Sequence, residues 1–273
     1  MNGIVLAIVS VTVIGLICAV VLSIASKVMA VPVNETESKI RECLPGANCG
    51  ACGYAGCDGY AAALANGEET KTSKCIPGSD GVAAQIAAVL GVEAEDVVEQ
   101  VAVIHCKGDC DVTHDKMDYQ GIESCKAVKL FYGGRGSCTY GCIGLGDCAA
   151  VCPQGAICLE KGIAHVDTRK CIGCGLCAKA CPNHLITLEA DTITCQVTCS
   201  NHDKGAQTRK VCTHGCIGCQ KCVKNCPAEA ISMDNNLAKI DYSKCISCGT
   251  CDDICPTGCI MEADFRGVFN KDK

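Results

Sequence analysis

Four runs of cysteine lie in the second half of this 273-residue chain, and their spacing is typical of metal–sulfur ligation. Three runs follow the pattern C-x2-C-x2-C-x3-C-P and end at Pro182, Pro227 and Pro256. The fourth, CTYGCIGLGDCAAVCP at residues 138–153, has Leu145 where a cysteine is expected. Such runs hold [4Fe-4S] clusters, whereas disulfide frameworks lack this regular rhythm. The sequence therefore predicts iron–sulfur clusters and leaves open how the Leu145 site is completed.

The cysteine runs belong to an internal repeat. Residues 138–188 overlay on residues 212–262 without a gap, and GAICLEKGIAHVDTRKC aligns with EAISMDNNLAKIDYSKC. Each half then contains two runs, which is the arrangement of a two-cluster ferredoxin domain. The aligned cysteines are Cys138 with Cys212, Cys142 with Cys216, Cys148 with Cys222, Cys152 with Cys226, Cys171 with Cys245, Cys174 with Cys248, Cys177 with Cys251 and Cys181 with Cys255.

In such domains the last cysteine of each run ligates the other cluster, and this rule assigns the ligands. The complete sets are Cys216, Cys219, Cys222 and Cys255; Cys245, Cys248, Cys251 and Cys226; and Cys171, Cys174, Cys177 and Cys152. The Leu145 site has Cys142, Cys148 and Cys181. We expect Cys138, shortly before Cys142, to supply its fourth thiolate, and a three-iron cluster held by three cysteines is the alternative.

Another four cysteines lie earlier in the chain, in LPGANCGACGYAGC and KCIPG. Cys49, Cys52, Cys57 and Cys75 have interleaved glycines that let the backbone wrap closely around an inorganic core. A short alanine-rich helix is expected from Asp58 to Ala65. One [4Fe-4S] cluster suits four thiolates, and a zinc ion is the alternative. The predicted total is five clusters.

The remaining cysteines leave a sixth cluster open. Cys106-x3-Cys110 and Cys195-x3-Cys199 form a matched pair that precedes each half. Cys106, Cys110 and Cys125 with one more ligand are candidates for the sixth cluster, whereas Cys195, Cys199 and Cys212 lack a fourth. Cys158 and Cys259 align with residues other than cysteine and are interpreted as packing residues. His105 and His214 lie near cysteines and are interpreted as surface or packing residues, with iron ligation or tuning of a cluster as the alternative.

The first 26 residues carry no charged side chain, and the apolar run from Ile4 to Ala25 reaches roughly 30 Å as a helix. Lys27 follows the run, so the positive-inside rule puts the cysteine-rich body in the cytoplasm. We therefore predict a single-pass protein of the cell membrane with an α+β body. Its predicted divisions are a transmembrane anchor (1–27), a linker (28–41), a four-cysteine domain (42–80), a helical spacer (81–105) and two ferredoxin-like domains (106–190 and 191–273).

Composition excludes several classes of function. The net charge of −6 argues against nucleic-acid binding, and no dinucleotide fingerprint or phosphate-binding loop is present. No nucleophile stands beside a base in a recognisable motif, so the predicted chemistry is one-electron transfer between clusters. Basic residues around the run at 216–226 are a hypothetical docking patch for an acidic ferredoxin: Lys204, Arg209, Lys210, Lys221 and Lys224.

The order of these motifs resembles the B subunit of the Rnf complex, the ion-translocating ferredoxin:NAD+ oxidoreductase, in its long form with tandem ferredoxin domains. The resemblance rests on LPGANCGACGYAGC and Cys75 after an apolar amino-terminal segment and before the tandem runs. It implies electron entry from reduced ferredoxin, NAD+ and flavin on partner subunits, and coupling to Na+ or H+ movement. The alternatives are an iron–sulfur component of another membrane dehydrogenase or hydrogenase and a protein that stores metal or clusters.

Overall fold

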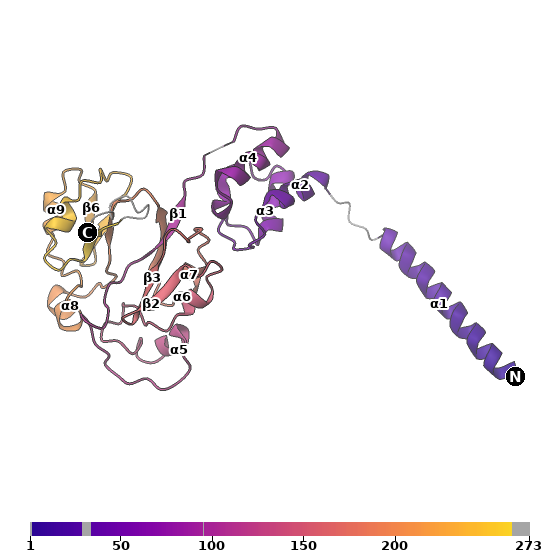
Figure 1. The fold of residues 1–273 in the computed structure, drawn as a ribbon, viewed down its shortest axis with the longest axis horizontal. Helices are drawn as coiled ribbons and strands as arrows, with labels where there is room; N and C mark the ends of the chain where they lie inside the picture. Colours follow the sequence, from indigo (N-terminus) through magenta and orange to yellow (C-terminus); the bar gives the residue numbers. More distant parts are fainter. Residues whose placement is uncertain (1, 29–33, 95, 264–273) are drawn as a thin grey trace.

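The computed structural model describes residues 2–28, 34–94 and 96–263. These ranges hold one long helix, α1, several shorter helices and two-stranded antiparallel sheets (Figure 1). The helices are α1 (Asn2–Val28), α2 (Glu35–Cys43), α3 (Cys57–Ala65), η1 (Thr72–Lys74), η2 (Ile76–Gly78), α4 (Ser79–Leu90), α5 (Cys125–Lys129), α6 (Asp147–Ala150), α7 (Leu176–Ala180), α8 (Gly205–Val211), α9 (Lys221–Asn225) and α10 (Thr250–Asp253). The strands are β1 (Gln100–Ile104), β2 (Ile157–Glu160), β3 (Ile163–Val166), β4 (Ile186–Ala190), β5 (Cys195–Val197), β6 (Ile231–Asp234), β7 (Leu237–Ile240) and β8 (Ile260–Glu262).

The amino-terminal segment forms α1, which lies apart from the other elements (Figure 1). In the ranges given above, no helix meets the combined length and apolarity required to cross a membrane. The membrane-spanning anchor predicted for residues 1–27 is therefore not confirmed.

A small helical unit follows α1. Helix α2 packs against both α3 and α4, and the bounds of α3 agree with the helix expected from Asp58. Tyr60 and Ile86 are fully buried at the centre of this unit, and the Tyr60 hydroxyl donates a hydrogen bond to the Lys71 carbonyl at 2.7 Å. The unit thus includes α2, where a linker was predicted, and α4, where a spacer was predicted.

The two cysteine-rich halves have matching sheets. In the first half β2 pairs with β3, and in the second half β6 pairs with β7 at the equivalent register. The outer sheets also match, because β1 pairs with β4 and β5 pairs with β8. Figure 1 shows the first half between the helical unit and the second half.

Matching partners across the outer sheets fix the register of the repeat. Ile104 pairs with Ile186, and Val197 pairs with Ile260 at the aligned position. Cys106 is consequently equivalent to Cys199, two residues beyond each strand partner, and the predicted match of Cys106 with Cys195 is wrong. The halves differ mainly in the connection that follows, which is long at residues 107–137 and short at residues 200–211.

Candidate metal centres

The first four predicted ligands lie together in the helical unit. Cys49 and Cys52 belong to the loop before α3, while Cys57 and Cys75 are each 9% exposed. The Asn48 side chain accepts a hydrogen bond from the Cys57 backbone N–H at 2.9 Å, which fixes the start of α3. Burial raises the pKa of Cys75 to about 11, and the other three cysteines add to the rise. A bound metal would displace this proton, so metal binding and thiolate formation are coupled.

The second centre is a cavity in the first half. Four cysteines contribute to its lining: Cys152, Cys171, Cys174 and Cys177. The backbone N–H of Ala156 donates to the Cys152 sulfur at 3.3 Å, and that of Ala102 donates to the Cys171 sulfur at 3.4 Å. These four residues are the set expected from the ferredoxin rule.

The cavity at the Leu145 site has a different fourth cysteine from the one expected. Its cysteines are Cys125, Cys142, Cys148 and Cys181. Cys125 begins α5 and is 8% exposed. Burial raises the pKa of Cys148 to about 12, and the charges of Cys142, Cys125 and Cys181 act in the same direction. Cys138, predicted for this place, lines another cavity instead.

The long connection at residues 107–137 delivers Cys125 to this site. Leu145 packs against the small cluster of Cys125, Val128 and Ile143, so the leucine supports α5 instead of ligating metal. The side chain of Asp147 accepts hydrogen bonds from the Lys126 backbone N–H at 3.1 Å and from the Ser124 hydroxyl at 2.9 Å. A charged acceptor such as the Asp147 carboxylate at the first turn stabilises a short helix such as α5.

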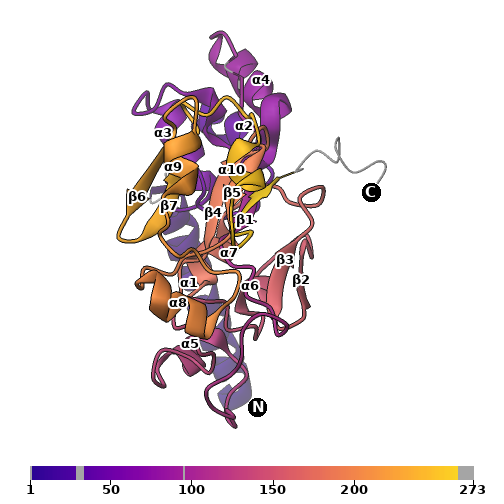
Figure 2. The same ribbon diagram turned by 90° about the vertical axis from the view of Figure 1, so that its left-hand side faces the viewer.

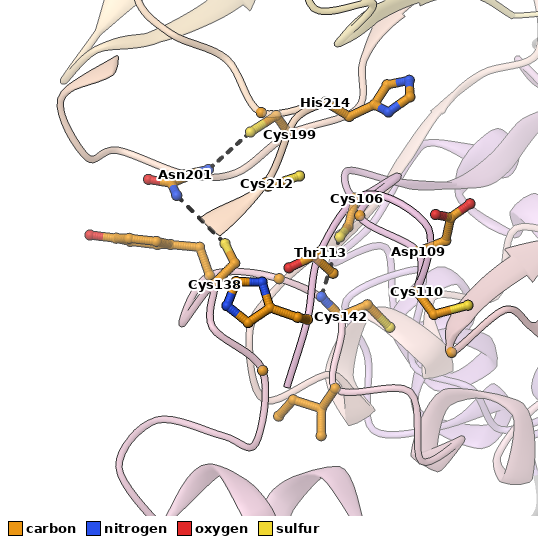
Figure 3. Close-up of a pocket in the computed structure, with 18 of the residues that line it drawn as sticks. Cys106, Asp109, Cys110, Thr113, Cys138, Cys142, Cys199, Asn201, Cys212 and His214 are labelled. Carbon is orange, nitrogen blue, oxygen red and sulfur yellow. Dashed lines mark hydrogen bonds between the residues drawn. The ribbon is translucent and has the colours of Figure 1, made fainter. Parts of the chain in front are cut away.

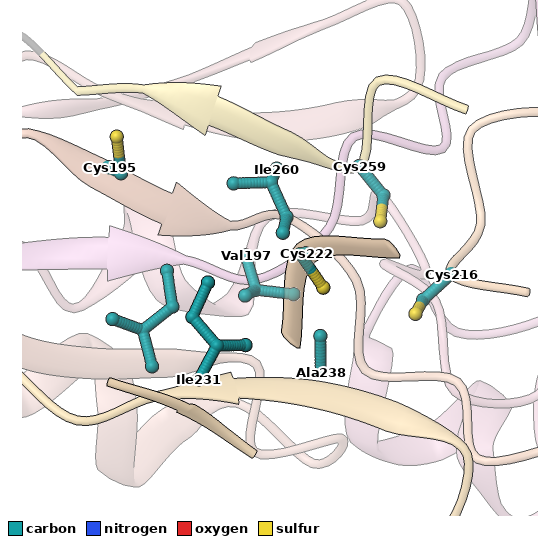
Figure 4. Packing of buried hydrophobic residues seen from close by; sticks show 9 residues of the cluster. Cys195, Val197, Cys216, Cys222, Ile231, Ala238, Cys259 and Ile260 are labelled. Carbon is teal, nitrogen blue, oxygen red and sulfur yellow. The ribbon is translucent and has the colours of Figure 1, made fainter. Parts of the chain in front are cut away.

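The fourth centre is a cavity in the second half with five cysteines in its lining: Cys216, Cys219, Cys222, Cys255 and Cys259. The first four are the predicted set, and Cys259 was interpreted as a packing residue. In Figure 4 the sulfurs of Cys216, Cys222 and Cys259 point toward one another. The sulfurs of Cys255 and Cys259 are 3.7 Å apart, and this contact lowers the pKa of Cys255 to about 4. Cys259 is thus an additional thiol beside a ligand set.

The last predicted set of cysteines also lies in the second half. Cys226, Cys245 and Cys251 pack against the core of β5–β8 and β6–β7, while Cys248 is exposed. The Ala230 backbone N–H donates to the Cys226 sulfur at 3.4 Å, as Ala156 does to Cys152 at the equivalent position. Cys195 is buried close to Cys251, and a hydrogen bond between the two thiols lowers the pKa of Cys195 to about 7.

The candidates for a sixth cluster are not brought together as predicted. Cys125 belongs to the Leu145 cavity, and Cys195 lies beside Cys251. Cys106, Cys110, Cys199 and Cys212 line one further cavity together with Cys138 (Figure 3). In the described parts of the chain, no three His, Cys, Asp or Glu side chains form a site for a single metal ion.

The two histidines near cysteines have different surroundings. Both ring nitrogens of His105 are hydrogen-bonded, Nδ1 to the Val197 carbonyl at 2.7 Å and Nε2 to the Thr187 hydroxyl at 2.8 Å. His105 therefore joins β5 to β4 and has no free nitrogen for iron. His214 lines the cavity shown in Figure 3.

Comparison with known proteins supports the presence of iron–sulfur domains. Three family models match: "Putative Fe-S cluster" at residues 44–77, "4Fe-4S binding domain" at 164–187 and "4Fe-4S dicluster domain" at 215–260. The B subunit of the Na+-translocating ferredoxin:NAD+ oxidoreductase complex of Acetobacterium woodii is 41% identical over 90% of this chain and 74% of its own length. Its counterpart in the proton-translocating complex of Clostridium ljungdahlii is 42% identical over 95% of this chain and 93% of its own. The chain belongs to the family of Rnf complex B subunits.

Membership in the Rnf B-subunit family assigns the general role. The chain is an electron-transfer subunit of a ferredoxin:NAD+ oxidoreductase complex and carries [4Fe-4S] domains. The residues present fit such clusters, because each centre offers thiols and several sulfurs accept backbone N–H bonds, which tune cluster potentials.

Proposed function

We propose that this protein accepts electrons from reduced ferredoxin and relays them into a membrane complex that reduces NAD+, coupled to Na+ or H+ movement. The observation that carries the proposal is a series of cysteine-lined centres running through the helical unit and both halves. The names of the related proteins supply the overall reaction. Clusters bound at these centres would supply one-electron transfer.

The proposed ligands differ from the sequence prediction at one position. Cys125 replaces Cys138 at the Leu145 site, since Cys125 shares that cavity with Cys142, Cys148 and Cys181. The other proposed sets are Cys49, Cys52, Cys57 and Cys75; Cys152, Cys171, Cys174 and Cys177; Cys216, Cys219, Cys222 and Cys255; and Cys226, Cys245, Cys248 and Cys251. These five sets each suit a [4Fe-4S] cluster, whose four irons each take one thiolate.

Contacts between the helical unit and the first half support electron transfer between them. The Lys179 ammonium group donates a hydrogen bond to the Cys49 carbonyl at 3.1 Å. Burial raises the pKa of Cys174, and the charge of Cys49 adds to this rise. A ligand of the first set therefore lies near a ligand of the second, which favours direct transfer from one to the other.

The second half has features that suit ferredoxin docking. Lys204 on the edge of α8 and Lys221 and Lys224 on α9 are exposed, as are Arg209 and Lys210. Figure 2 shows α8 and α9 on the same face of the second half. None of these five basic side chains forms an ion pair within the described residues. Cys219 is exposed beside them, so an acidic partner bound here would be close to a ligand set.

Membrane attachment is also part of the proposal. It rests on the apolar sequence from Ile4 to Ala25 and on the word translocating in the names of the related complexes. Integral membrane subunits and a flavoprotein that binds NAD are the proposed partners. We expect the chain to remain in membranes washed with alkaline carbonate, and recovery in the wash would contradict attachment through this segment.

Anaerobic rapid mixing tests the proposed function. The full chain, isolated with its clusters, is mixed with chemically reduced ferredoxin while the visible absorbance of both proteins is followed. We expect ferredoxin oxidation to match cluster reduction, and several electrons to enter each chain. Clusters that are reduced by dithionite and not by ferredoxin would contradict the proposed donor.

A further inference from the structure

A cavity between the two halves contains cysteines from both. Its volume is about 300 Å³, far more than a single water molecule needs. Cys106 and Cys138 line it from the first half, and Cys199 and Cys212 line it from the second (Figure 3). None of these four belongs to the five proposed ligand sets.

The four cysteines form two equivalent pairs. The Cys142 backbone N–H donates to the Cys106 sulfur at 3.3 Å, and the Cys216 backbone N–H donates to the Cys199 sulfur at 3.3 Å. Cys142 and Cys216 are themselves aligned in the repeat, as are Cys138 and Cys212. Each half therefore offers an equivalent pair of thiols to the boundary. Two more first-half cysteines line the cavity, Cys110 and the Leu145-site ligand Cys142.

The sulfurs from opposite halves lie close to one another. A Cβ added to Gly108 would be 3.5 Å from the Cys212 sulfur and 3.7 Å from the Cys106 sulfur, so these two sulfurs are separated by no more than the sum of those distances. The absence of a side chain at Gly108 keeps the space between them open.

A buried asparagine links the other two sulfurs. Asn201, which is 2% exposed, donates from its side-chain nitrogen to the Cys138 sulfur at 3.5 Å and from its backbone N–H to the Cys199 sulfur at 3.4 Å. N–H groups directed at sulfur stabilise cluster-bound thiolates. N–H donors are thus already directed at three of these four thiols, those of Cys106, Cys138 and Cys199.

We infer that Cys106, Cys138, Cys199 and Cys212 hold a further [4Fe-4S] cluster at the boundary of the two halves, where it carries electrons from one half to the other. The inference rests on the proposed function, which requires electrons to cross this boundary. Each transfer moves a single electron, so one centre is oxidised, its neighbour is reduced, and no bond or proton changes.

The position of the cavity explains how electrons would pass between the two halves. Cys106 accepts a hydrogen bond from the backbone of Cys142, a ligand of the Leu145 site. Cys199 accepts one from the backbone of Cys216, a ligand of the corresponding site in the second half. A cluster here would be next to one cluster on each side and would complete an unbroken series through the chain.

Iron and acid-labile sulfide analysis of the anaerobically purified full chain tests the inference. Six four-iron clusters correspond to about 24 iron atoms per chain, and five correspond to about 20. We expect the wild type to contain about 24 and the double variant Cys138→Ser/Cys212→Ser to contain about 20. The control Cys110→Ser should retain the wild-type iron, because the Cys110 thiol is exposed and points away from the four sulfurs in Figure 3. The inference would be overturned if the double variant contained as much iron as the wild type. It would also be overturned if the wild type contained zinc in place of the sixth cluster's iron.

Alkylation of the wild type tests the same site without a substitution. Iodoacetamide is added to the cluster-loaded chain, and the modified cysteines are identified by mass spectrometry before and after cluster removal by a chelator. Cys138 and Cys199 should be modified only after removal, whereas the exposed Cys158 should be modified in both samples. Modification of Cys138 and Cys199 in the loaded chain would refute the inference. If ferredoxin still reduces a chain with about 20 iron atoms, the boundary cluster fails and the proposed function stands.

Discussion

The carboxylate of Asp147 accepts a hydrogen bond from the backbone N–H of Cys125 at 3.0 Å. Asp147 begins α6, which contains Cys148, while Cys125 begins α5 within the connection at residues 107–137. One carboxylate therefore ties together two elements that each carry a cysteine of the Leu145 cavity. In the aligned second half Lys221 takes the place of Asp147, and α8, the helix of the corresponding connection, contains no cysteine.

Asp147→Ala should weaken the attachment of α5. Loss of a helix-capping acceptor costs about 1 kcal/mol, and this carboxylate also accepts two further bonds, so we expect a loss of about 1–3 kcal/mol in the free energy of unfolding. Guanidinium unfolding of the full chain, followed by cluster absorbance, measures it. Asp147→Asn is the matched control, because it keeps an acceptor oxygen and should cost less. Equal losses in the two variants would contradict the capping role.

Cys125→Ser should convert the Leu145 site into a three-cysteine site. Cys142, Cys148 and Cys181 would remain, and three thiolates suit a three-iron cluster. We expect a new three-iron EPR signal in the oxidised variant and a loss of about one iron atom per chain. Cys158→Ser, on the exposed face of β2, is the control and should leave the spectrum unchanged. An unchanged spectrum in Cys125→Ser would remove Cys125 from the proposed set.

These features show where sequence reasoning reached the structure and where it did not. The ferredoxin rule anticipated the cavity of Cys152, Cys171, Cys174 and Cys177. The spacing of cysteines within a run determines how the run folds around a cluster, so the rule applies wherever a run is complete. It missed Cys125, since an irregular connection of about thirty residues has no periodicity that indicates where it returns. The equivalence of Cys106 and Cys199 was hidden for a related reason, because connections of unequal length follow them and only strand pairing reveals the register.

Charge reversal on α9 should slow electron entry. In Lys221→Glu/Lys224→Glu we expect ferredoxin oxidation to be about tenfold slower at low ionic strength, with a weaker dependence on salt, because the basic surface no longer steers an acidic partner. Stopped-flow rates at several salt concentrations measure this. Lys39→Glu/Lys71→Glu changes the net charge equally on the exposed surface of the helical unit and serves as the control. Identical rates for both double variants would exclude docking at α9.

Gly144→Ala should disrupt the Leu145 site through a steric clash. Gly144 has a φ of +76°, and an added Cβ would lie 2.1 Å from the Gly162 carbonyl oxygen, so the backbone must shift. Gly155 has a similar φ of +57° with open space around it. Gly155→Ala should therefore cost only the left-handed strain of about 1–2 kcal/mol, whereas Gly144→Ala should cost more and lose about four iron atoms. Iron analysis and guanidinium unfolding compare them, and similar values for both would contradict the close approach.

Glu69 should stabilise the loop that carries Cys75 in a pH-dependent manner. Its carboxylate binds the Lys74 ammonium group and accepts hydrogen bonds from the Lys71 N–H at 3.0 Å and the Tyr54 hydroxyl at 2.9 Å. These contacts, with Lys74 first, lower the pKa of Glu69 to about 2, below the value of about 4.3 in an unfolded chain. The stabilisation is complete above pH ~4.3 and is lost as the pH falls toward about 2, because the unfolded state binds the proton first.

Hydrogen exchange of the peptides around α3 and η1 measures this effect in the full chain. Glu69→Gln should exchange faster than the wild type by the same factor at about pH 7 and 5.5, and by a smaller factor at about pH 4. Glu68→Gln is the matched control, because Glu68 is exposed and adjacent in sequence. The control should exchange as the wild type does at each pH. An exchange-rate difference between Glu69→Gln and the wild type that increases on acidification would contradict the lowered pKa. A carboxylate with a lowered pKa in the folded state loses its stabilising effect in acid, so the difference should decrease.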